Sequence, residues 1–170
     1  MRKGAPGHGL HVHRPQGAGR LDNPDRYDVL YLSDAAAGAV AEAFGAFDTW
    51  SEALFDGSPS LPGSVRALGV YELAPAAAVA DLDDARLLVE LSLRPSEVVT
   101  RERRVTQAWA LRLFESGRFA GARWWSYWDP RWSSFGLWNL GGLRLLEVSP
   151  LERADTHVEE AARVLRRAWV

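Results

Sequence analysis

One carboxylate, Glu42, stands out among the residues that could take part in chemistry. It lies in the segment AAAGAVAEAF, where nearly every neighbour is apolar, so the helix expected here is hydrophobic on almost all sides. A carboxylate is costly to bury unless another group pairs with it. Glu42 therefore either reaches solvent or an arginine at the helix edge, or lies in a pocket and stabilises a positive charge.

Tyr31 and Ser126 are candidates for the walls of such a pocket. Tyr31 ends a short apolar run just before the Glu42 helix, a junction where rigid elements often hold binding residues, although a half-buried core aromatic fits the same position. Ser126 lies in RWWSYW, which suits an ordinary core, an interface, or a pocket that stacks a planar ring. No GxSxG surrounds the serine, so a serine-hydrolase elbow is not indicated.

Arg14 and Arg20 flank a glycine-containing loop in RPQGAGR. Two guanidinium groups at this spacing could clamp a pyrophosphate, or they could be solvated surface charges, since Arg outnumbers Lys nineteen to one in this chain. His11 and His13 would share one face of a short strand. A third ligand with suitable spacing is missing, so we expect no metal site.

The composition indicates a folded protein and limits its partners. The 170 residues include eight Trp and are 47% hydrophobic, which excludes a disordered chain and fits one domain over residues 1–170, with residues 1–8 mobile. A net charge of −2 offers no positive field for nucleic acid, and the lack of cysteine removes disulfides and thiolate metal sites. No apolar run is long enough for a membrane helix or a signal peptide, so we expect a cytoplasmic protein with no membrane or direct nucleic-acid partner.

Hydrophobic periodicity and turn residues outline the elements that must position these side chains. Helices are expected over residues 34–47, 84–91, 101–115 and 158–169, the last capped by Thr156. Strands are expected over residues 10–13, 29–32, 65–73, 79–82, 121–127, 134–138 and 143–148. Without a regular strand–helix alternation, this order predicts an α+β fold. Neither GxGxxG after a strand nor GxxxxGK[ST] occurs, so no Rossmann or P-loop site is supported.

The aromatic strand GARWWSY carries a further expectation, because side chains alternate along a strand. Trp124 and Ser126 then face one way, and Trp125 and Tyr127 face the other. We expect Trp124 to lie near the pocket and Trp125 to fill the core.

In their order along the chain, these segments resemble the RES domain, a family named for an Arg, a Glu and a Ser. The matching pieces, which span about residues 10–150, are HVHR, GAGRLDNP, VLYLS, AVAEAF, the DL of residues 81–82, the QxxA of residues 107–110, and GARWWS. Glu42 follows Tyr31 by eleven residues, as in the family. The chain departs from the family pattern at Leu21, where an aromatic is usual, and at Asp22, which is an additional residue.

The resemblance implies an ADP-ribosyltransferase-like mixed sheet core flanked by helices, and an NAD-degrading toxin that needs no cofactor because NAD is its substrate. Glu42 would stabilise the oxocarbenium-like transition state, and Ser126 would orient Glu42 or bind the substrate. Arg14 and Arg20 would hold the pyrophosphate, while Tyr31 would pack on the nicotinamide side. Water or phosphate would accept the ADP-ribose.

The same resemblance implies a partner, a cognate antitoxin with a helix-turn-helix domain. Two alternatives stay open from the sequence. One is a non-catalytic RES-like module that binds a nucleotide or a partner protein, and the other is an ADP-ribosyltransferase that modifies a protein.

Overall fold

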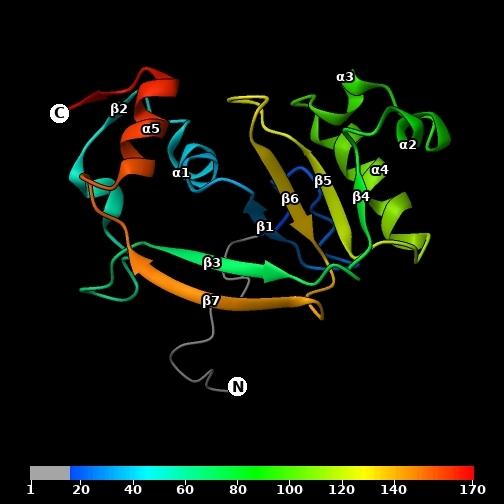
Figure 1. Ribbon diagram of the computed structural model, residues 1–170, viewed down its shortest axis with the longest axis horizontal. Coiled ribbons are helices and arrows are strands. Elements are labelled where there is room, and N and C mark those ends of the chain that lie inside the picture. The colour runs from blue at the N-terminus through cyan, green and yellow to red at the C-terminus, as the bar shows by residue number, and fades with distance from the viewer. Residues whose placement is uncertain (1–15) are drawn as a thin grey trace.

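A mixed four-stranded sheet forms the centre of the protein, as the computed structural model of residues 16–170 shows (Figure 1). Its strands follow in the order β1 (Leu30–Ser33), β6 (Ser133–Leu137), β5 (Gly121–Trp125) and β4 (Val79–Asp81). The β1–β6 and β6–β5 pairs are antiparallel, and the β5–β4 pair is parallel. The mixed sheet and its surrounding helices confirm the predicted α+β class.

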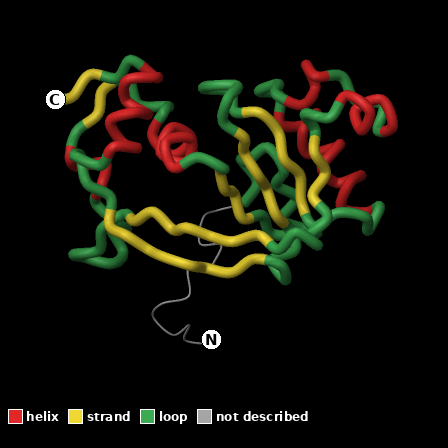
Figure 2. Tube along the Cα trace, in the orientation of Figure 1, coloured by secondary structure: helices red, strands yellow, loops and turns green. Residues whose placement is uncertain are grey.

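Two groups of helices lie beside opposite edges of this sheet, one near β4 and the other near β1 (Figures 1 and 2). One side carries α2 (Ala85–Glu90), α3 (Pro95–Val98) and the long α4 (Arg103–Glu115). The other carries α1 (Ala36–Phe44), α5 (Thr156–Leu165), the 3-10 turn η1 (Glu52–Phe55), and the parallel pair β2 (Thr49–Trp50) and β8 (Ala168–Trp169). Within residues 16–170, no helix has the length and apolar character needed to cross a membrane.

A two-stranded antiparallel ribbon runs beneath both sides and consists of β3 (Ala67–Leu73) and β7 (Leu143–Pro150) (Figure 1). Their register shifts between Val70 and Tyr71, which marks a bulge in the ribbon. The ribbon connects η1 to β4 on its outward path and β6 to α5 on its return. It therefore ties the two halves of the molecule together.

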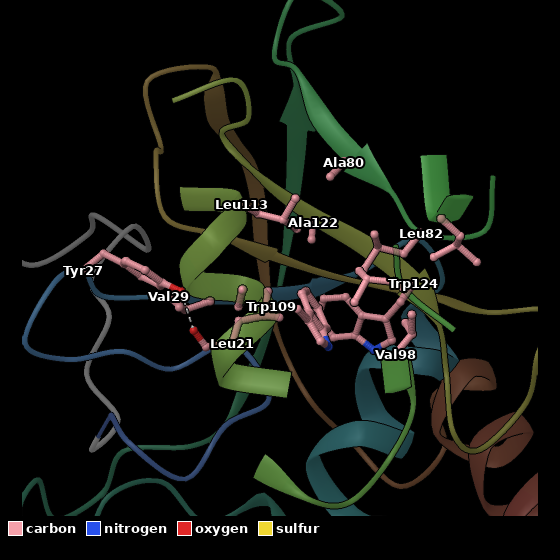
Figure 3. Close-up of a cluster of buried hydrophobic side chains, with 13 residues drawn as sticks. Leu21, Tyr27, Val29, Ala80, Leu82, Val98, Trp109, Leu113, Ala122 and Trp124 are labelled. Atoms are coloured by element: carbon pink, nitrogen blue, oxygen red, sulfur yellow. Dashed lines mark hydrogen bonds between the residues drawn. The ribbon is translucent and has the colours of Figure 1, made fainter. Parts of the chain in front are cut away.

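The larger hydrophobic core lies between the sheet and α4 (Figure 3). Leu21 is fully buried, and Trp109 and Trp124 are 2% and 4% exposed. A Cβ on Gly136 would collide with the side chain of Leu21, so the glycine leaves the space that this leucine fills. Leu21, which replaces a family aromatic, is thus a core residue.

The predicted elements are largely present, with a correction at the C-terminus. Helix α5 begins at Thr156 and its N-cap is Asp155, so the prediction that Thr156 caps the helix was wrong. The helix ends at Leu165, where Arg166 takes a left-handed conformation with φ of 54°. The prediction that this helix continues to Trp169 was wrong, because Trp169 lies in β8 and packs edge-on against Trp50 with centroids 5.7 Å apart. The strand expected over residues 10–13 lies outside the described residues.

The assignment of the two tryptophans in β5 also needs correction. Trp124 lies near the candidate site, as expected, but it is also the buried member of the pair, whereas Trp125 is only partly buried. Alternation along the strand was right, but the face toward α4 supplies both the core and the site. The prediction that Trp125 fills the core was therefore wrong.

Trp109 gives a direct test of this core. Trp109→Ala should lower the free energy of unfolding by ~3–5 kcal/mol, because it removes a large buried ring from between α4 and the sheet. Urea denaturation followed by circular dichroism measures the change. Val89→Ala is the control, since Val89 is 80% exposed and its truncation should change stability by no more than ~0.5 kcal/mol. Equal effects would contradict this description of the core.

Candidate functional site

The carboxylate of Glu42 is held by two serine hydroxyls from the sheet. Ser126 Oγ donates to Glu42 Oε1 at 2.7 Å, and Ser134 Oγ donates to the same oxygen at 3.3 Å. Both serines are buried, at 2% and 4% exposure, whereas the Glu42 residue as a whole is exposed. No ion pair joins Glu42 to a cation within residues 16–170. The helix glutamate therefore pairs with hydroxyls and keeps one edge open.

The segment that follows β5 fixes the direction of the Ser126 hydroxyl. Ser126 N donates to Trp132 O at 2.7 Å, and Trp128 N donates to Ser126 Oγ at 3.2 Å, so the hydroxyl proton is free to point at Glu42. The turn back to β6 is built around Asp129, whose carboxylate accepts from the backbone and side chain of Arg131. These hydrogen bonds lower the pKa of Asp129 to about 2. The Asp129 carboxylate is therefore ionised at neutral pH and accepts these hydrogen bonds from Arg131.

Two aromatic rings lie next to the serine–glutamate group. Tyr31 meets Trp124 edge-on, with ring centroids 6.4 Å apart and planes at 82°. Trp124 lies opposite Ser134 in the β5–β6 register, so the tryptophan and the hydroxyl share one face of the sheet. The guanidinium carbon of Arg20 is 5.9 Å from the Trp124 ring centroid. Trp124 is therefore a neighbour both of Arg20 and of Ser134, the serine that donates to Glu42.

A buried carboxylate, Asp22, organises the loop that carries Arg20. Asp22 is 1% exposed, and its Oδ2 accepts from Gly17 N at 2.8 Å and from Gly19 N at 2.7 Å. Its Oδ1 accepts from Tyr31 Oη at 2.8 Å, and that phenol oxygen in turn accepts from Leu21 N. The residue that the sequence presents as an addition to the family pattern is thus the centre of the loop.

Helix α4 holds the same loop from the outside. Gln107 Nε2 donates to the carbonyls of Gly17 and Gly19 at 2.9 and 3.0 Å. Asn23 Nδ2 donates to Gln107 O at 3.1 Å, and Arg103 Nε donates to Ala18 O at 3.2 Å. The loop is consequently fixed between the sheet and a long helix.

Arg20 points from this loop toward the end of α3 and the site. Its Nη1 donates to Val98 O at 2.5 Å and to Thr100 O at 2.9 Å. Burial, followed by repulsion from Arg103, lowers the pKa of Arg20 to about 10, while Glu42 and Tyr31 oppose that change. Arg20 therefore remains a cation at neutral pH and lies within electrostatic reach of Glu42.

The structure brings four of the sequence candidates, Arg20, Tyr31, Glu42 and Ser126, into one site. Arg14, His11 and His13 lie outside the described residues, so their places are not assigned. Sequence reasoning missed the second hydroxyl donor and the anchor of the loop, Ser134 and Asp22. That Ser134 faces Glu42 follows only from the pairing of the strands. Asp22, in contrast, could have been predicted as an anchor, because it is a single acidic residue in a glycine-containing loop.

The fold and the site define an α+β domain in which a carboxylate accepts hydrogen bonds from serine hydroxyls and lies near two aromatic rings and an arginine. Comparison with protein families matches the RES domain over residues 5–157, nearly the whole chain, and the chain belongs to that family. RES domains are toxin-like, NAD-related domains and are generally found in toxin–antitoxin systems. No curated protein and no solved structure matched the chain.

Asp22 can be tested by the stability of the loop it anchors. Asp22→Ala removes an acceptor from two backbone amides and one phenol, and should lower the free energy of unfolding by ~3–5 kcal/mol. Amide hydrogen exchange at Gly17 and Gly19 should accelerate in the same variant. Asp28→Ala is the matched control, since Asp28 is exposed nearby and should leave both quantities unchanged. Unchanged exchange at the two glycines would refute the anchoring role.

Proposed function

We propose that this protein is an NAD-degrading toxin that cleaves the bond between nicotinamide and ribose. The observation that carries the proposal is the Glu42 carboxylate, oriented by Ser126 and Ser134 beside Tyr31, Trp124 and Arg20 in a RES domain. NAD presents groups that match these side chains: a cationic nicotinamide ring, a ribose, and an anionic pyrophosphate. Each has a partner of suitable chemistry within the site.

The reaction asks little covalent chemistry of the protein. The bond between ribose C1′ and the nicotinamide nitrogen breaks, and its electron pair leaves with nicotinamide, which becomes neutral. Positive charge then develops on the ribose ring as an oxocarbenium-like centre, which a fixed negative charge stabilises. Water or inorganic phosphate adds to C1′ and gives up a proton to solvent. The products are nicotinamide and ADP-ribose, or nicotinamide and the phosphorylated ADP-ribose.

Glu42 suits the role of the fixed negative charge. Oε1 accepts both serine hydroxyls, and Oε2 makes no hydrogen bond within residues 16–170, so it is available to ribose hydroxyls or to the developing cation. Hydroxyl donors orient the carboxylate and leave its charge in place, whereas an arginine in their position would cancel that charge. Preorganisation of this kind typically contributes a few kcal/mol to the stabilisation of a transition state.

The remaining side chains bind the ends of the substrate in this proposal. Arg20 contacts the pyrophosphate, with Arg14 as a second cation on the strength of the family resemblance. Tyr31 and Trp124 pack on the planar nicotinamide side. The activity would be exerted in the cytoplasm and restrained by a cognate antitoxin that carries a helix-turn-helix domain.

The decisive test is Glu42→Gln, which keeps the size of the side chain and removes its charge. Purified wild-type protein incubated with NAD should release nicotinamide, measured by chromatography, and the variant should be slower by about 10²-fold or more. Glu147→Gln, an exposed change on β7, should keep full activity. Normal turnover by the Glu42 variant would remove the catalytic assignment. A wild-type protein that binds NAD but releases no nicotinamide would indicate a non-catalytic module instead.

The two serines should differ in their effect on turnover, because their hydrogen bonds to Glu42 differ in length. Ser126→Ala, which removes the 2.7 Å bond, should lower kcat about tenfold, and Ser134→Ala, which removes the 3.3 Å bond, should lower it less. KM should change little in either variant, because the serines act through Glu42. Melting temperatures measured alongside show whether the fold is intact. A Ser126 variant that melts early yet turns over normally would make the hydroxyl structural.

A further inference from the structure

Arg103 carries a buried hydrogen-bond donor that the hydrogen bonds of the fold do not use. It is the first residue of α4, and its Nε donates to Ala18 O, but its Nη1 is buried with no hydrogen-bond partner within the described chain. A buried, unpaired guanidinium N–H is costly and rare in folded proteins. Such an atom therefore indicates a missing acceptor.

Arg103 lies close enough to Arg20 for the two cations to repel each other. Within residues 16–170 neither guanidinium forms an ion pair with a carboxylate. Six other described arginines do, namely Arg26, Arg118, Arg123, Arg131, Arg144 and Arg167. The donors of Arg20 that are assigned go to two backbone carbonyls, which do not neutralise its charge. These two neighbouring positive charges therefore have no carboxylate in direct contact within the described residues, although Glu42 acts on Arg20 through space.

The loop beside these arginines cannot supply its glycine amides to an anion. Gly17 N and Gly19 N already donate to Asp22, and the carbonyls of both glycines accept from Gln107. An anion at this place would accordingly be bound by side chains and not by a cradle of backbone N–H groups. Guanidinium groups bind phosphate oxygens bidentately, and they do so most strongly where they are partly desolvated.

We infer that Arg103 and Arg20 together form a binding site for a diphosphate group, with the unused Nη1 of Arg103 as one of its donors. On the proposed function, this site takes the pyrophosphate of NAD and selects diphosphate-containing nucleotides over uncharged nucleosides. Arg103 is then a specificity residue contributed by α4, a helix that otherwise serves to hold the loop and the core.

Thermal melting with inorganic pyrophosphate tests the site without any need for cleavage. At matched ionic strength, pyrophosphate should raise the Tm of the wild-type protein. Arg103→Gln should weaken the apparent affinity about tenfold or more, the equivalent of one charge-assisted hydrogen bond, and Arg103→Lys should fall between the two. Arg104→Gln is the matched control, because Arg104 is the exposed neighbour on the same helix and its change alters the net charge equally.

Equal stabilisation of the wild-type and Arg103→Gln proteins, equal losses in the Arg103 and Arg104 variants, or no stabilisation of the wild type would each overturn the inference. A second measurement uses turnover. Arg103→Gln should lower kcat/KM for NAD about tenfold and leave that for nicotinamide riboside, which has no phosphate, unchanged. A wild-type protein that binds pyrophosphate but releases no nicotinamide would defeat the proposed function alone, and nicotinamide release without pyrophosphate binding would defeat this site alone.

Discussion

The buried carboxylate of Asp22 is the constraint on which the arrangement of the site depends. A charge in the interior must be surrounded by donors, and Asp22 obtains them from two loop amides and from the phenol of Tyr31. This requirement joins the loop to β1, while α4 secures the loop from its other side through Gln107. Arg20 follows directly after the anchored glycines, so its direction is set by the same charge. The loop cannot relax without leaving that carboxylate unsatisfied.

The sheet provides the second half of the arrangement by a different kind of contact. Ser126 and Ser134 orient Glu42 with neutral donors, and Arg20 acts on it only through space. An ion pair in that position would hold the carboxylate equally well but would cancel most of the field it projects. Glu42 and Arg20 are therefore each held by uncharged groups, so neither charge is neutralised by a direct ion pair within the described residues.

The sequence predicted the helices and strands best where the pattern was long and periodic, as in α4, which ends at Glu115 as expected. The family motifs singled out Glu42 and Ser126, but no local pattern could show that the two side chains meet. Trp169 and Trp125 were misassigned because tertiary packing decides both positions. Trp169 lies in β8, where it packs against Trp50, and not at the end of α5, and the main core lies on the α4 side of the sheet. Ser134 became visible only through the β5–β6 register.

The long separation between the partners of Glu42 has a consequence for biosynthesis. Ser126 and Ser134 follow it by 84 and 92 residues, and β1 has no antiparallel neighbour until β6 emerges from the ribosome. At ~5–20 residues per second, translation leaves Glu42 without its hydroxyl donors for roughly 5–20 s. On the proposed function, the growing chain lacks its oriented carboxylate throughout that interval. The site is therefore completed late in synthesis, when β6 pairs with β1.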